Sequence, residues 1–157
     1  MKKDATLSND RMYRYSLSRI WDESKDLVLF VCLNPSTANE STDDPTVTRC
    51  IEFARAWNYG GVLIGNLFAL RATDSGKLYK AADPIGPEND KWLGRLAVRA
   101  KLIIAAWGNE GSHMNRSKNV LRILRTPYAL MINKTGEPRH PLYVPLSTRP
   151  TPYKNPE

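Results

Sequence analysis

The sequence predicts an α/β fold in which helices cover both faces of a central, mainly parallel sheet. Four apolar, β-prone runs alternate with segments whose apolar residues recur at helical spacing, and this alternation is typical of parallel sheets with crossover helices. The chain has 157 residues, 41% hydrophobic and 25% charged, which is the size and composition of one globular domain. We expect a core over residues 11–145 and an extended tail over 146–157.

The first elements are predicted to be a pair of antiparallel strands. Residues 1–10 are expected to be a loose start. Aromatic and polar residues alternate roughly over 13–21, which predicts an edge strand. The run 27–33 is continuously apolar, as expected of a strand buried on both faces. We expect this run to pair antiparallel with 13–21.

Three helices are predicted after these strands. Asp44-Pro45 combines a favoured N-cap residue with proline in the first turn, so a helix is predicted over 45–57. A long loop over 67–86 leads to a second helix over 87–100, and a third helix is predicted over 115–125. The remaining strands are predicted at 62–66, 102–106 and 128–132.

These elements predict a three-layer α/β/α sandwich. With right-handed crossovers, the four buried strands are expected to run parallel in the order 2-1-3-4, numbered along the chain from 27–33. The strand at 13–21 is expected to lie antiparallel at one side. In such sheets ligands bind outside the carboxyl ends of the strands, where the strand order reverses.

Charge and composition narrow the function classes. The formal net charge of +7 favours a polyanionic partner such as DNA or a nucleotide, although a basic surface can also serve solubility alone. No apolar run approaches the roughly 18 residues of a membrane helix, and no apolar signal region opens the chain. We therefore expect a cytoplasmic protein without a membrane partner.

Metal and cofactor motifs are missing from the sequence. Cys32 lies in a predicted strand and Cys50 on an apolar helix face, so both are expected to be reduced core thiols. Two cysteines and two histidines show no paired ligand spacing, and there is no glycine-rich phosphate loop. We expect neither a metal nor a cofactor.

Four polar motifs follow the predicted buried strands, directly or after a short loop. Because parallel strands end at one edge of the sheet, Asn34, Asn66 and His140 are expected to line one cleft there. The motifs are Leu33-Asn34-Pro35-Ser36, Gly65-Asn66-Leu67-Phe68-Ala69-Leu70-Arg71, Ala106-Trp107-Gly108-Asn109 and Arg139-His140-Pro141-Leu142-Tyr143.

Each of these side chains has a functional and a structural interpretation. The amide of Asn66 can pair with the edge of a pyrimidine or brace a loop. The amide of Asn34 can orient a water or a sugar hydroxyl, or close an Asx turn. His140 lies in a loop stiffened by two prolines, where it can stabilise negative charge on a leaving base or be a surface histidine. Trp107 is expected to be structural, and Asp44 to cap a helix.

The order of the motifs resembles that of the uracil-DNA glycosylase superfamily, over roughly residues 27–145. That superfamily has Asp-Pro or Asn-Pro after its first core strand, a base-reading Asn after the second, Leu-Trp-Gly at the end of the third and a late His-Pro-Ser. Here the corresponding segments are Asn34-Pro35, Asn66, Ala106-Trp107-Gly108 and His140-Pro141, and Leu142 stands in place of the serine. The chain resembles more closely the bacterial and phage family DUF1643, a domain of unknown function. This second resemblance rests on Asn-Pro-Ser-Thr-Ala at 34–38, Asp-Pro-Thr-x-x-Arg at 44–49 and Arg-His-Pro-Leu-Tyr at 139–143.

The resemblance implies a uracil-DNA glycosylase-like fold and an N-glycosylase that excises a pyrimidine or modified pyrimidine from DNA. Asn34 would place the attacking water, and His140 would stabilise the departing base. The base and its flanks would be contacted by Pro35, Ser36, Asn66, Phe68, Trp107, Leu142 and Tyr143. Phosphates would be held by Arg71, Lys134 and Arg139.

Two alternatives share this fold. One is a non-catalytic nucleic-acid or nucleotide-binding module, favoured by the asparagine at position 34 in place of a carboxylate. The other is an enzyme that acts on free nucleotides. In each case we expect a monomer.

Overall fold

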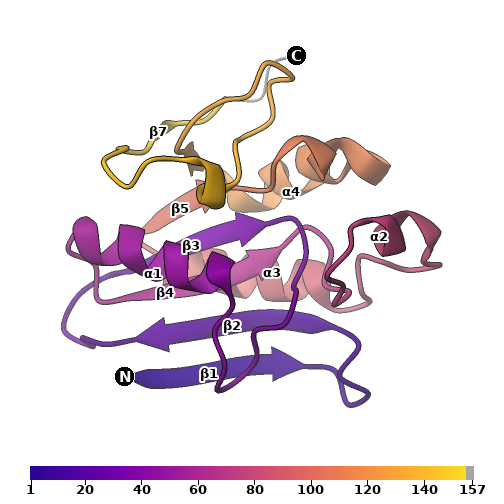
Figure 1. Ribbon diagram of the computed structural model, residues 1–157, viewed down its shortest axis with the longest axis horizontal. Coiled ribbons are helices and arrows are strands. Elements are labelled where there is room, and N and C mark those ends of the chain that lie inside the picture. Colours follow the sequence, from indigo (N-terminus) through magenta and orange to yellow (C-terminus); the bar gives the residue numbers. More distant parts are fainter. Residues whose placement is uncertain (155–157) are drawn as a thin grey trace.

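The computed structural model describes residues 1–154, which form a seven-stranded mixed sheet with helices on both faces (Figure 1). The α/β class is therefore confirmed. The strands lie in the order β1-β2-β4-β3-β5-β6-β7. Their bounds are β1 Lys2–Leu7, β2 Arg14–Ile20, β3 Leu27–Cys32, β4 Gly61–Asn66, β5 Leu102–Ala105, β6 Tyr128–Ala129 and β7 Thr151–Pro152.

The strand β3 occupies the centre of the sheet. It runs parallel to β4 on one side and to β5 on the other, and β5 in turn runs parallel to β6. Side chains of β3 alternate between two buried clusters: Phe30 packs on one face of the sheet, and Leu29 and Val31 on the other. Both faces of β3 are thus covered, which is why its sequence is continuously apolar.

The helices divide between the two faces of the sheet. α1 (Pro45–Ala56) packs on one face, whereas α3 (Asn89–Arg99) and α4 (Arg116–Leu124) pack on the other. α1 begins as predicted: Asp44 caps it by accepting a hydrogen bond of 2.9 Å from the backbone N–H of Val47, and proline occupies the first turn. The free thiols of Cys32 and Cys50 are both buried, as expected.

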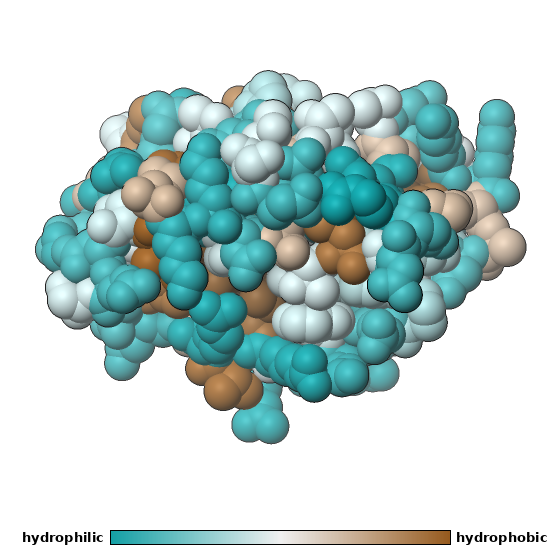
Figure 2. Space-filling view, turned by 90° about the horizontal axis from the view of Figure 1, so that it is seen from below, coloured by the Kyte–Doolittle hydropathy of each residue, from teal (hydrophilic) through white to brown (hydrophobic). Residues whose placement is uncertain are grey.

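The edge strand β1 is hydrophilic. Lys2, Lys3 and Asp4 are exposed along it, and Figure 2, which looks at the molecule from this side, shows mostly hydrophilic side chains with smaller hydrophobic patches between them. Charged residues on an edge strand discourage pairing with another chain.

Two expectations about the N-terminal strands were wrong. Residues 1–10 are not loose, because six of them form β1, paired antiparallel with β2. The strand at 27–33 does not pair with 13–21. Instead β2 lies antiparallel to β4, since β3 already has parallel neighbours on both sides.

Later parts of the chain also differ from expectation. The loop over 67–86 contains the short helix α2 (Gly76–Lys80). The strand expected at 128–132 is reduced to Tyr128–Ala129, because Ile132 instead bridges Pro138. The tail over 146–157 is not simply extended: β7 pairs with β6 and buried Tyr153 anchors it. Its last residues, 155–157, lie outside the described residues.

Candidate functional site

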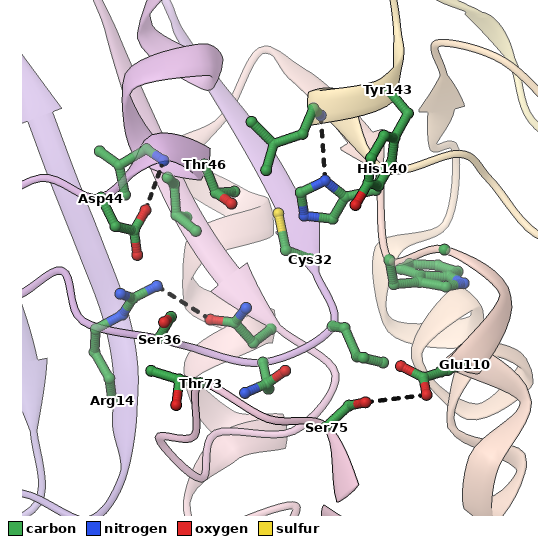
Figure 3. Close-up of a pocket in the computed structure, with 18 of the residues that line it drawn as sticks. Arg14, Cys32, Ser36, Asp44, Thr46, Thr73, Ser75, Glu110, His140 and Tyr143 are labelled. Carbon is green, nitrogen blue, oxygen red and sulfur yellow. Dashed lines mark hydrogen bonds between the residues drawn. The ribbon is translucent and has the colours of Figure 1, made fainter.

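A cleft of about 420 Å³ opens at the carboxyl edge of the sheet (Figure 3). Cys32 and Asn66, the last residues of β3 and β4, both line it. From β3 the chain passes to α1 on one face, and from β4 to α3 on the other, so the strand order reverses here. The cleft has the size and the location expected of a small-molecule site.

Asn66 is buried in this cleft beside the guanidinium of Arg14. Its Oδ1 accepts a hydrogen bond of 3.4 Å from Nη2 of Arg14, whose Nη1 donates to the carbonyl of Ala38 at 3.1 Å. Because the amide oxygen faces Arg14, the amide NH₂ faces away from it. Within residues 1–154 this NH₂ donates no hydrogen bond, so it is available to an acceptor on a ligand.

The backbone at the end of β4 is fixed from α3 and α4. Nδ2 of the fully buried Asn89 donates to the carbonyls of Asn66 and Leu67 at 2.9 and 3.0 Å. Nε of Arg116 donates to the same Leu67 carbonyl at 3.0 Å, and its Nη2 pairs with Asp90. Two helices thus hold Asn66 in one position before any ligand arrives.

His140 has a defined tautomer. Its Nδ1 accepts a hydrogen bond of 3.2 Å from the backbone N–H of Leu142, so in the neutral ring the proton is on Nε2. Burial lowers the pKa of His140 below its usual value of 6.5, and the nearby carboxylate of Asp44 opposes this shift only in part. At neutral pH the ring is therefore an uncharged donor through Nε2–H.

Asn34 lines the cleft while bracing its own loop. Its Nδ2 donates to the carbonyls of Ala72 at 2.8 Å and Pro35 at 3.0 Å, which occupies both amide hydrogens. Its Oδ1 accepts no hydrogen bond from any residue in 1–154. Asn34 does not close the predicted Asx turn, which would need its oxygen as acceptor; it braces the loop through its NH₂ instead and retains one acceptor for a water or a hydroxyl.

The rim of the cleft is polar. Asp44 caps α1 and also accepts from the backbone N–H of Ala38 at 3.3 Å, so its carboxylate is already engaged. Glu110, on the opposite side in Figure 3, accepts a hydrogen bond of 3.1 Å from the hydroxyl of Ser75. Further hydroxyls come from Ser36, Thr46 and Thr73.

Trp107 forms a fixed wall of the cleft. Its indole is almost fully buried and donates from Nε1 to Oε2 of buried Glu137 at 2.7 Å. The other oxygen of Glu137 accepts from the hydroxyl of Ser117 at 3.0 Å. Trp107 therefore has the structural role that was predicted, with one surface facing the cleft.

The predicted base-contacting residues divide into two groups. Ser36, Leu142 and Tyr143 line the cleft together with Asn66 and Trp107. Leu142 is 40% exposed and Tyr143 is 75% exposed. Pro35 and Phe68 do not line the cleft: both are buried, and Phe68 packs against His113.

The three residues predicted to hold phosphates are not gathered at the cleft. Arg71 borders an adjoining pocket instead. Nε of Arg139 donates to Oδ1 of Asn133 at 2.8 Å, which braces the turn before it. Lys134 is exposed on that turn.

Sequence reasoning missed Arg14. The sequence predicted an edge strand over 13–21 and assigned Arg14 no role in it, whereas its guanidinium donates to the carbonyl of Ala38 and the amide oxygen of Asn66, both distant along the chain. Arg14 is 3% exposed, its Nε has no partner within the described residues, and burial lowers its pKa to about 10. A buried arginine beside a cleft is the clearest unpredicted feature of this site.

Residues 1–154 contain no group of three or more His, Cys, Asp or Glu side chains that could hold a metal ion. Nor does any helix in that part of the chain have the length and apolar character to cross a membrane.

Comparison with protein families identifies one match. The model of a family described as a protein of unknown function, DUF1643, matches residues 14–142. The chain belongs to the DUF1643 family. The matched span runs from Arg14 to Leu142, so in this DUF1643 protein it includes every cleft residue named above except Tyr143. Neither the curated proteins nor the solved structures contain a match to the chain.

Proposed function

We propose that this DUF1643 protein is a nucleobase-handling enzyme, an N-glycosylase that excises a pyrimidine or modified pyrimidine from DNA. One observation carries the proposal. The amide of Asn66 and the imidazole of His140 border the same cleft from different segments, and the NH₂ of the first and the Nε2–H of the second are free of partners in residues 1–154. Such donors suit the carbonyl edge of a pyrimidine.

The proposed chemistry follows from these groups. Cleavage of an N-glycosidic bond develops negative charge on the departing base, and a preorganised donor aimed at its oxygen lowers the barrier. His140 supplies this donor through Nε2–H, with its ring held by the Leu142 N–H. Asn66 reads the base edge, and the free oxygen of Asn34 orients the attacking water.

Access to the base requires its extrusion from the duplex. The exposed side chains of Leu142 and Tyr143 lie at the cleft, where one of them can fill the gap left in the base stack. The net charge of +7 attracts the DNA backbone. The order of the four motifs, which resembles that of uracil-DNA glycosylases, supports the same assignment.

Base release tests this function directly. The protein is incubated with duplexes that each carry one uracil, mismatched thymine or 5-substituted pyrimidine, and abasic sites are then cleaved by alkali. We expect strand scission at the substituted position of at least one duplex. If no duplex yields abasic sites, the glycosylase proposal fails.

A specific observation supports a second candidate, a binding module or an enzyme of free nucleotides on the same fold. Both carboxylates that line the cleft, Asp44 and Glu110, already accept hydrogen bonds. Asn34 cannot act as a general base, because an amide does not take up a proton at neutral pH. Tight binding of DNA or a nucleotide without base release would favour this candidate.

A further inference from the structure

A second pocket, which we call the side pocket, adjoins the cleft. It has a volume of about 440 Å³ and shares Ser36 and Thr73 with the cleft, so the two cavities meet at these hydroxyls. The basic residues Arg11, Arg71 and Lys77 line it. The side pocket is therefore lined by basic residues, whereas the adjoining cleft contains the carboxylates of Asp44 and Glu110.

Arg71 has an unused donor in the side pocket. Its Nε is buried and has no hydrogen-bond partner within residues 1–154. Its Nη1 donates to the carbonyl of Arg11 at 3.3 Å, which fixes one side of the guanidinium only. A buried donor without an acceptor costs free energy, and an oxyanion of a ligand would supply the acceptor.

The charge balance of the side pocket is positive. Arg11 is paired with Glu40 at 2.8 Å, and Asp74 accepts from the backbone N–H of Gly76 at 2.9 Å. Arg71 and Lys77 form no ion pair with any residue in 1–154. Arg14 carries a third positive charge near this pocket. The charge of Arg71 lowers the pKa of Arg14, in addition to the larger effect of burial, so the two guanidinium groups lie near each other.

We propose that the cleft and the side pocket hold a single ligand, a nucleotide whose base lies in the cleft and whose phosphate lies against Arg71 and Lys77. A guanidinium group can donate two parallel hydrogen bonds to two oxygens of one phosphate, and a lysine ammonium adds a compact positive charge. The hydroxyls of Ser36 and Thr73, at the junction, face the sugar or the phosphate oxygens. The base half of this assignment rests on the proposed function; the phosphate half rests on the side pocket alone.

Binding measurements separate the two halves. Isothermal titration of the full chain compares the four 2′-deoxynucleosides, their 5′-monophosphates, inorganic phosphate and a five-residue single-stranded deoxyoligonucleotide. The variants are Arg71→Gln and Lys77→Gln, and the matched control is Arg122→Gln, an exposed arginine on α4. Lys77 is exposed, so its substitution leaves folding intact if the less exposed Arg71 variant does not fold.

We expect at least one monophosphate to bind tenfold or more tightly than its nucleoside, a difference of about 1.4 kcal/mol or more. Lys77→Gln and Arg71→Gln should each reduce this preference, whereas Arg122→Gln should keep it. Equal affinity for nucleosides and monophosphates, or an unchanged preference in both variants, would overturn the phosphate site and leave the proposed function standing.

The remaining outcomes distinguish the proposals and the source of the phosphate. Binding of inorganic phosphate that depends on Arg71, without any nucleoside binding, would support the side pocket and overturn the placement of a free base in the cleft, whereas the glycosylase proposal is decided by the base-release assay. Absence of binding by every probe would contradict both. If the phosphate site is confirmed, the effect of Arg71→Gln identifies its natural ligand. A larger loss of affinity for the oligonucleotide than for the monophosphates identifies a DNA phosphodiester, and a larger loss for the monophosphates identifies a free nucleotide.

Discussion

The protonation state of His140 is set by its surroundings. The backbone N–H of Leu142 occupies Nδ1, and a proton on that nitrogen would break this hydrogen bond. Burial disfavours the charged ring as well and lowers the pKa of His140. A neutral donor of this kind stabilises negative charge on a departing base without carrying a charge into the cleft beforehand.

This state predicts the titration of His140. NMR of the imidazole nitrogens, assigned with a His140→Gln variant, should show a midpoint below 6.5, the usual pKa of histidine. As the pH falls from 6.5 toward the lower pKa of the folded state, this histidine binds more protons in the unfolded chain than in the folded one. The contribution of His140 to stability should therefore be present above pH 6.5 and fall as the pH drops toward the lower pKa of the folded state. A midpoint above 6.5 would contradict the neutral-donor account.

The pairing of Asn66 with Arg14 predicts a change of ligand preference in Asn66→Asp. A carboxylate beside the buried guanidinium forms an ion pair and presents no NH₂ donor to the cleft. We expect affinity for ligands with a carbonyl at this position to fall about 10²-fold, since an acceptor is left facing an acceptor. Asn66→Ala serves as the control, because it removes the donor without adding a charge. Equal ligand profiles of Asn66→Asp and wild type would show that Asn66 does not face the ligand.

At the scale of an element, the loop after β5 depends on one close approach. A Cβ at Gly111 would lie 2.1 Å from Cδ1 of Trp107 and 2.9 Å from Oε2 of Glu137. Gly111→Ala must therefore displace the indole that forms the wall of the cleft and weaken its hydrogen bond to Glu137.

We expect Gly111→Ala to reduce the free energy of unfolding by about 3 kcal/mol, the upper part of the range for overpacked cores. The matched control is Gly94→Ala in α3, where a Cβ meets no atom within 4 Å of the described structure. There the change should raise stability by about 0.5–1 kcal/mol, because alanine favours a helix over glycine. Chemical denaturation measures both, and similar stabilities of the two variants would contradict this packing account.

At the scale of the whole molecule, the net charge of +7 and the side pocket predict salt-dependent binding. Fluorescence anisotropy with a labelled oligonucleotide at several salt concentrations should show affinity falling as salt rises, because phosphate contacts release counterions. Arg71→Gln should make the slope of log affinity against log salt shallower by about 0.7–0.9, and Arg122→Gln should not. Salt-independent binding would contradict the proposed phosphate contacts and would indicate that the net positive charge serves only solubility.

The sequence could predict those parts of the fold that local patterns encode. Asp44-Pro45 marked the start of α1, and the apolar run at β3 marked a strand covered on both faces. β1 escaped prediction because Lys2, Lys3 and Asp4 carry no apolar alternation, and its strand exists only through pairing with β2.

The residues of the candidate site likewise separate into those that local sequence patterns predict and those that only tertiary contacts place. Asn34, Asn66 and His140 could be placed together because Asn66 ends β4, Asn34 comes shortly after β3 and His140 comes after β6 by way of a loop, and these parallel strands end at one edge of the sheet. Arg14 could not, since its guanidinium is held by the carbonyl of Ala38 and the amide of Asn66, which lie far from it along the chain. The positions of Phe68 and Arg71 outside the cleft depend on how their loop folds back, which sequence spacing does not encode.

The most direct test of the central claim is base release by His140→Ala. With a duplex that the wild-type protein cleaves at a modified pyrimidine, single-turnover assays should show the rate falling about 10²–10³-fold, the usual effect of losing one such donor. Binding of the same duplex, measured by anisotropy, should change little, because Asn66 and the side pocket remain. Full activity in His140→Ala, or no base release by the wild type from any modified-pyrimidine duplex, would contradict the account.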